Sequence, residues 1–116
     1  IASLAGGAPA EPNDPAATRW PNGWTRCAVQ TEGVAALIVH GTADAVVPFA
    51  GGEFDARYWA YVNDCATERA PTEPSPCEAF PRCPEGKQVT FCPVEGLEHR
   101  IWSEAASNAW SFFAAL

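Results

Sequence analysis

Three apolar runs in the sequence predict the strands of a buried sheet. The first covers residues 1–5 and ends at a pair of glycines. The second, residues 34–39, is apolar at every position, and the third, residues 87–94, is rich in residues that favour strands. A strand that is apolar on both of its faces is typical of a parallel sheet covered by helices. We therefore expect an α/β fold with three parallel strands.

A helix is expected from Gly51 to about Cys65. Within this segment Phe54, Tyr58 and Val62 recur every four residues, which places them on one side of a helix. This spacing predicts a single apolar stripe that the helix buries.

A second helix is expected from about Ser103, a residue type that favours the N-cap position, to Leu116. Apolar residues again fall at helical spacing along it. We expect its buried side to be formed by Ala106, Ala109, Trp110, Phe113 and Leu116.

The segments 6–33 and 66–85 are rich in turn-forming residues and are predicted to be irregular connections. The element order then describes one α/β domain over residues 1–116. Two helices cannot cover three parallel strands on both faces. We therefore expect that a partner half, not contained in this sequence, completes the sheet.

Composition narrows the classes of partner. Fourteen acidic residues outnumber seven basic ones, for a net charge of −7, and the basic residues form no stripe that could follow a phosphate backbone. Nucleic acid is therefore not expected as a partner. No apolar run reaches the roughly 18 residues that a membrane span needs, so no membrane partner is expected either.

Five cysteines, with no methionine, in 116 residues favour an oxidising compartment, so we expect a secreted protein. None of them has C-x-x-C spacing, which weakens a zinc or thioredoxin-type interpretation. Because their number is odd, one thiol must be free or paired outside this chain. The chain opens at Ile1, and we expect that it was cut from something longer.

Two turns that follow predicted strands carry the candidate chemistry. Asp44 follows the second strand and His99 follows the third. Open α/β sheets place their ligands at these carboxyl ends of the strands. A carboxylate there can accept a hydrogen bond from Nδ1–H of the histidine and leave Nε2 to take a proton from a nucleophile. We therefore predict Asp44 and His99 as catalytic residues within hydrogen-bonding distance.

The chain order of acid before histidine is that of the α/β-hydrolases, in which a serine comes first. That serine should lie in a G-x-S-x-G motif, and the sequence contains none. The nucleophile is therefore expected on another segment.

His40 is the competing histidine. It lies at the end of its strand, and we interpret it as a residue that shapes the turn around Asp44. A metal site formed by His40, Asp44, Glu98 and His99 is a further alternative, but their spacing matches no familiar ligand set. We predict no metal and no cofactor.

Five groups of residues are spread over nearly the whole chain. They are Leu37-Ile38-Val39-His40-Gly41-Thr42-Ala43-Asp44 with Val47-Pro48 and Gly51-Gly52, then Trp59 with Asn63-Asp64-Cys65, then Cys83 and Val89, then Gly96-x-x-His99 with Trp102, and Trp110-x-Phe112-Phe113. Together they resemble the esterase family that contains polyhydroxybutyrate depolymerases and type-one feruloyl esterases, and the acid-bearing segment is the most specific of them. The resemblance implies that the chain is the C-terminal half of an α/β-hydrolase sheet, completed by a missing N-terminal half.

This resemblance implies a serine carboxylic ester hydrolase. Its substrate would be a hydroxycinnamoyl or acetyl ester on plant polysaccharide, or a polyhydroxyalkanoate. We predict Trp102 and Val47 as substrate-binding residues. The family usually has glycine and proline where this sequence has Glu98 and Ser103, which bears on substrate preference.

The resemblance also favours a disulfide between Cys65 and Cys83. Cys77 and Cys92 then remain as an internal pair. Cys27 is predicted to link the chain covalently to the N-terminal half that carries the nucleophile. The alternative function, of a different class, is a non-catalytic binding module that retains the hydrolase fold.

Overall fold

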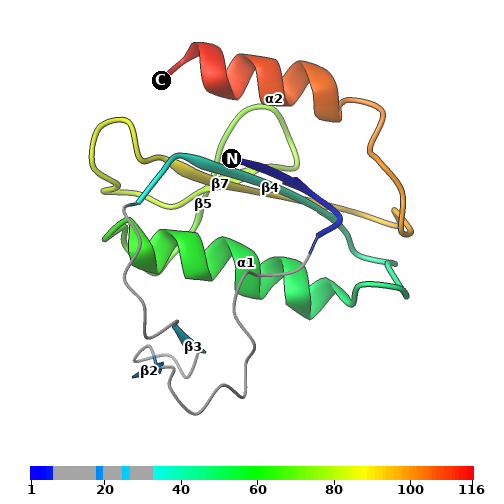
Figure 1. The fold of residues 1–116 in the computed structure, drawn as a ribbon. Coiled ribbons are helices and arrows are strands. Elements are labelled where there is room, and N and C mark those ends of the chain that lie inside the picture. The colour runs from blue at the N-terminus through cyan, green and yellow to red at the C-terminus, as the bar shows by residue number, and fades with distance from the viewer. Residues whose placement is uncertain (7–17, 20–24, 27–32) are drawn as a thin grey trace.

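The computed structural model describes residues 1–6, 18–19, 25–26 and 33–116. It is a small mixed α/β domain in which a five-stranded sheet carries one helix on each face (Figure 1). The strand order is β1 (Ala2–Leu4), β4 (Ala36–Gly41), β7 (Val89–Val94), β6 (Glu78–Ala79) and β5 (Ala70–Pro71).

The three predicted strands β1, β4 and β7 are present and parallel. All six residues of β4 are buried. Ile38 packs on the side of α1 (Phe49–Val62), whereas Leu37 and Val39 pack on the side of α2 (Ala105–Ala114). Because helices cover both faces of β4, its side chains are buried on either side of the sheet.

The prediction of an irregular connection over residues 66–85 was wrong in part. This segment forms the short hairpin β5–β6, which adds two antiparallel strands to the sheet beyond β7. Each strand has only two residues, and Pro71 in the outermost strand has no N–H for a longer ladder. A periodicity test needs a longer run than this, so the pattern could not reveal these strands.

Both predicted disulfides are present. Cys65 and Cys83 are joined at 2.05 Å, and Cys77 and Cys92 at 2.00 Å. The first bridge ties the segment after α1 to the turn before β7, and the second ties the hairpin to β7 itself. Two disulfides indicate an oxidising environment. Cys27 lies outside the described residues.

Helix α1 begins at Phe49, two residues before the predicted start. Its small residues Ala56 and Ala60 are fully buried and lie against the sheet. The predicted stripe is buried as well, but Phe54 and Tyr58 form a separate cluster with Trp59 and Val62.

The end of α1 is tied to the beginnings of two strands through one side chain. Nδ2 of Asn63, which is 1% exposed, donates to the carbonyl oxygens of Val34 at 2.8 Å and Lys87 at 2.7 Å. These bonds fix α1 against β4 and β7.

The predicted buried side of α2 was right for Ala109, which packs against the core, and wrong for the other four residues. The helix begins at Ala105, after Glu104 rather than Ser103 at the cap, and it packs on the sheet through residues that include Ala109 and Phe112. Trp110 is 78% exposed and Phe113 is 43% exposed, whereas Asn108 is buried. The helix is apolar on two sides, so its spacing alone does not say which side meets the sheet. Also exposed are the predicted residues Ala106 and Leu116.

Within the predicted connection 6–33, β2 (Thr18–Arg19) and β3 (Thr25–Arg26) form an antiparallel pair. Among the described residues β1 has one neighbour, β4, and lies at the edge of the sheet. None of the helices in the described ranges is long and apolar enough to cross a membrane.

Candidate active site

Asp44 is held rigidly in the turn after β4. Its Oδ1 accepts hydrogen bonds from the backbone N–H groups of Val46 and Val47, each at 2.9 Å. A side chain that bonds to N–H groups two and three residues ahead closes a tight local turn. Asp44 is 6% exposed, so its carboxylate is fixed below the surface.

The turn that holds Asp44 is joined to the turn after β7 by three hydrogen bonds. The N–H of Thr42 donates to the carbonyl of Val94 at 3.0 Å, and the N–H of Ala43 donates to the carbonyl of Leu97 at 3.1 Å. Oγ1 of Thr42 accepts from the N–H of Gly96 at 2.9 Å. Together these bonds set the distance between the acid and the histidine.

Gly41 allows the two turns to come this close. A Cβ atom at Gly41 would lie 2.0 Å from the carbonyl oxygen of Leu97, a distance no side chain tolerates. Glycine is therefore required here for close approach of two backbones.

Nδ1 of His99 lies 2.9 Å from Oδ2 of Asp44. The predicted contact between the two residues, at the ends of adjacent strands, is confirmed. The side chain of His99 is 42% exposed, whereas that of Asp44 is fully buried. A buried carboxylate thus orients an accessible imidazole, which is the arrangement that general-base chemistry needs.

Two opposing effects set the pKa of Asp44. Burial alone would raise it, but hydrogen bonds from His99, Val47 and Val46, together with the charge of His99, hold the pKa below its ordinary value. Asp44 is therefore a carboxylate at neutral pH and can stabilise a positively charged His99.

His40 approaches the same carboxylate oxygen, Oδ2, as His99 does. It is fully buried in β4, and its Nε2 is 2.9 Å from the carbonyl oxygen of Val47 and 3.5 Å from Oδ2 of Asp44. Asp44 thus faces one buried and one accessible histidine. These contacts agree with the interpretation of His40 as a residue that shapes the turn.

The residues of the alternative metal site do not form a group of ligands that could hold a metal ion. In the part of the chain that the structure describes, no three His, Cys, Asp or Glu side chains gather closely enough to hold a metal ion. Glu98, beside His99, instead pairs with Arg100.

The two predicted substrate-binding residues have structural contacts of their own. Val47 contributes its backbone to the turn around Asp44. Trp102 is half-buried and packs against the core cluster formed by Leu37, Val39, Cys77 and Cys92. Their contact with a substrate stays a prediction.

Asp55 is a buried carboxylate that the sequence analysis missed. It lies on α1, is 2% exposed, and accepts hydrogen bonds from the side chains of Ser3 and Trp59. Burial raises its pKa to about 6, although both hydrogen bonds and the nearby His40 act to lower it. A helix residue between apolar neighbours gives no sequence signal for this environment.

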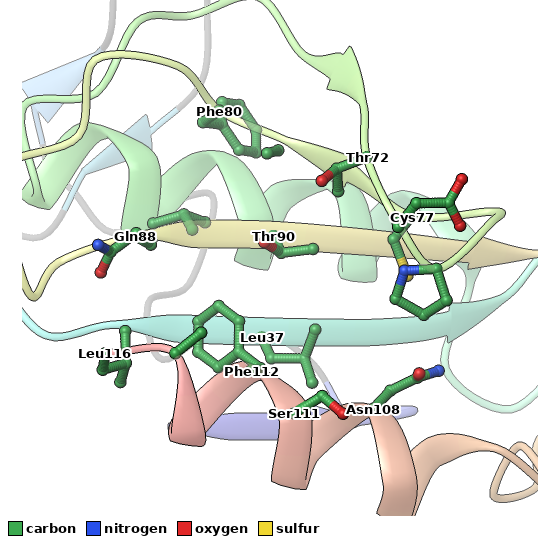
Figure 2. A pocket seen from close by; sticks show the side chains of 15 residues that line it. Leu37, Thr72, Cys77, Phe80, Gln88, Thr90, Asn108, Ser111, Phe112 and Leu116 are labelled. Carbon is green, nitrogen blue, oxygen red and sulfur yellow. The ribbon is translucent and has the colours of Figure 1, made fainter.

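A cavity of about 310 Å³ lies between α2, β7 and the β5–β6 hairpin. Figure 2 shows Gln88 and Asn108 toward its two ends, with Leu37 and Phe112 between them. It contains neither Asp44 nor His99 and is separate from their site.

Comparison with models of known protein families and with curated proteins found no match to this chain. The candidate site is therefore defined by its own geometry, namely an acid–histidine pair at the carboxyl ends of neighbouring parallel strands.

Proposed function

We propose that this chain supplies the acid and the base of a serine carboxylic ester hydrolase. The observation that carries the proposal is the 2.9 Å contact between Oδ2 of Asp44 and Nδ1 of His99. The acid is buried and held by two backbone N–H groups, while the histidine is accessible. Such an acid–histidine pair activates a nucleophile in hydrolases of this class.

In the proposed reaction, Nε2 of His99 removes the proton of a serine hydroxyl as the serine oxygen attacks the ester carbonyl. Asp44 stabilises the imidazolium that forms. His99 then gives its proton to the departing alkoxide as the carbon–oxygen bond of the ester breaks. Water, activated by His99 in the same way, attacks the acyl-serine, which releases the acid and restores the serine.

The serine and the oxyanion-binding groups would come from an N-terminal half of the same hydrolase. In support of this, β1 lies at the edge of the sheet with β4 as its neighbour in the described part of the chain. A further parallel strand that carries the nucleophile could pair there. The sequence itself contains no G-x-S-x-G motif.

The substrate class rests on the resemblance of the acid-bearing and histidine-bearing segments to the feruloyl esterase and polyhydroxybutyrate depolymerase family. Hydroxycinnamoyl esters, acetyl esters and polyhydroxyalkanoates are the substrates proposed. A secreted location fits these substrates and is supported by the two disulfides.

The test is hydrolysis by the natural protein that contains this chain. Purified protein should release ferulate from methyl ferulate, acetate from an acetylated xylan or hydroxybutyrate from poly(3-hydroxybutyrate). We expect His99→Ala to lower kcat by about a thousandfold or more. Glu95→Gln is the control, since Glu95 is an exposed side chain in the same turn, and it should retain activity.

Retained hydrolysis in His99→Ala, with the same rate as the natural protein, would contradict the proposal. The absence of G-x-S-x-G from this chain favours one alternative, a binding module without catalytic activity. That function requires ester or polysaccharide binding without turnover, which the same assays distinguish.

A further inference from the structure

We propose that His40 is a positioning residue for Asp44, and that Gly52 of α1 holds it in place. The kinetic part of this inference rests on the proposed function. The structural part, that His40 sets the contact between Asp44 and His99, does not depend on it.

The hydrogen on His40 can be assigned from its partner. The carbonyl oxygen of Val47, 2.9 Å away, can only accept a hydrogen bond, so Nε2 of His40 must carry the hydrogen. Oδ2 of Asp44 lies 3.5 Å from the same nitrogen. The N–H group of His40 therefore faces both the turn and the carboxylate.

His40 and Asp44 hold the same residue from its two backbone ends. The carbonyl of Val47 accepts from His40, while the N–H of Val47 donates to Oδ1 of Asp44 at 2.9 Å. If His40 moved, Val47 would lose its carbonyl partner and its N–H would no longer be fixed against Asp44. Oδ2 of Asp44 would then lose its alignment with His99.

The ring of His40 has no freedom to move because it is enclosed. It is fully buried, and its ring and that of Phe49 lie in an edge-to-face arrangement with their centroids 6.2 Å apart. On another side lies Gly52, where an added Cβ atom would be 2.4 Å from both Cγ and Nδ1 of His40. Nδ1 of His40 has no hydrogen-bond partner among the described residues.

A buried imidazole nitrogen without a hydrogen-bond partner lowers the stability of the fold, so an apolar side chain would suit this position better if it only had to fill space. The other nitrogen of His40 faces Val47 and Asp44, and a leucine could not replace it as a donor. In the described part of the chain, the charged groups that face His40 are Asp44 from its own turn and Asp55 from α1.

Two adjacent glycines of α1 provide a matched experiment. Gly52→Ala places a methyl group against the ring of His40, whereas at Gly51 an added Cβ meets only Cγ1 of Val47 at an ordinary 3.5 Å. In the natural protein we expect Gly52→Ala to lower kcat about ten- to a hundredfold, as expected for a displacement of about 1 Å, with KM changed less than twofold. Gly51→Ala should match the natural protein.

A double-mutant cycle with Asp44→Asn shows whether the loss passes through Asp44. Because His40 is proposed to act through Asp44, Gly52→Ala should lower kcat less than twofold when residue 44 is already asparagine. A purely structural loss of folded protein would lower the apparent kcat by the same factor in both backgrounds.

Replacements of His40 test the same claim if Gly52→Ala does not fold. His40→Gln keeps an N–H group within reach of the carbonyl of Val47, whereas His40→Leu fills space without a donor. We expect the glutamine variant to retain at least ten times the kcat of the leucine variant. Equal activity in the two folded variants would overturn the proposal.

Nuclear magnetic resonance separates this inference from the proposed function. The resonance of the Nδ1–H proton of His99, which lies in the contact with Asp44, is compared in the natural protein, Gly52→Ala and Gly51→Ala. We expect this resonance to shift or broaden in Gly52→Ala alone. If the natural protein hydrolyses no ester, the proposed function fails and this readout still decides the role of His40; an identical resonance in all three proteins would overturn it.

Discussion

Asp44 uses both carboxylate oxygens, one toward two backbone N–H groups and one toward His99. The two oxygens therefore have separate structural roles. One fixes the carboxylate within its own turn, and the other orients a side chain that lies 55 residues further along the chain. A replacement that keeps an oxygen toward the two N–H groups can therefore change the contact with His99 while the turn keeps its shape.

Asp44→Asn should lower kcat about a thousand- to ten-thousandfold with little change in KM. The amide has the shape of the carboxylate but no charge, so it neither stabilises the imidazolium nor enforces the same tautomer of His99. Steady-state kinetics with methyl ferulate measure the effect. A kcat within tenfold of the natural protein would show that His99 acts without Asp44.

Asp55 should make the folded state less stable as the pH rises from about 4 to about 6. Its pKa is near 6 in the folded protein and near 3.8 when unfolded, so in this range the folded state binds the extra proton. Raising the pH removes that proton and costs stability on the order of 2–3 kcal/mol across the window.

Urea unfolding at a series of pH values measures this effect. In Asp55→Asn we expect the slope of unfolding free energy against pH between 4 and 6 to be flatter than in the natural protein. The pKa of Asp44 is shifted the other way, so its contribution is lost only below its ordinary value, under pH 4. Parallel slopes for the two proteins would contradict the assignment of the raised pKa to Asp55.

The pairing of Asp44 with His99 could be predicted because each follows an apolar strand, and neighbouring parallel strands end at the same edge of the sheet. The rest of their surroundings could not. The bond from Gly96 to Thr42 depends on the paths of two loops, and the burial of Asp55 depends on how α1 faces β1. Neither is encoded by local spacing.

At the scale of elements, strands of six residues were predictable and those of two residues were not. Strand β4 is apolar from Ala36 to Val39 because helices cover both its faces, and that is visible in the sequence. The β5–β6 hairpin is instead held to the sheet by the bridge between Cys77 and Cys92. Its stability comes from a distant partner and leaves little pattern in the hairpin itself.

Helix α2 was predicted at the right place with the wrong face toward the sheet. Trp110→Ala should change the free energy of unfolding by less than about 0.5 kcal/mol, because Trp110 is 78% exposed. Phe112→Ala should cost about 2 kcal/mol, because Phe112 packs on the core cluster of Leu37 and Val39. Urea unfolding of both variants provides the comparison.

A loss in Trp110→Ala as large as that in Phe112→Ala would mean that the outer face of α2 is covered in the natural protein. The two variants therefore also show whether the outer face of α2 is exposed to solvent in the natural protein.

At the scale of the whole molecule, Cys27 is predicted to hold this chain to the half that carries the nucleophile. Four of the five cysteines are paired within the chain, which leaves Cys27 as the remaining thiol. Gel electrophoresis of the natural protein should show a larger species without reductant and this chain as a separate band with reductant. One band at the mass of this chain under both conditions would refute the link.

The central claim, that Asp44 and His99 serve a serine on another segment, is tested most directly by active-site labelling. The natural protein is treated with a fluorophosphonate, which reacts with activated serines, and the labelled peptide is located by mass spectrometry. We predict one labelled serine, outside residues 1–116, and loss of labelling in His99→Ala. Absence of label in the natural protein, or labelling that persists unchanged in His99→Ala, would contradict it.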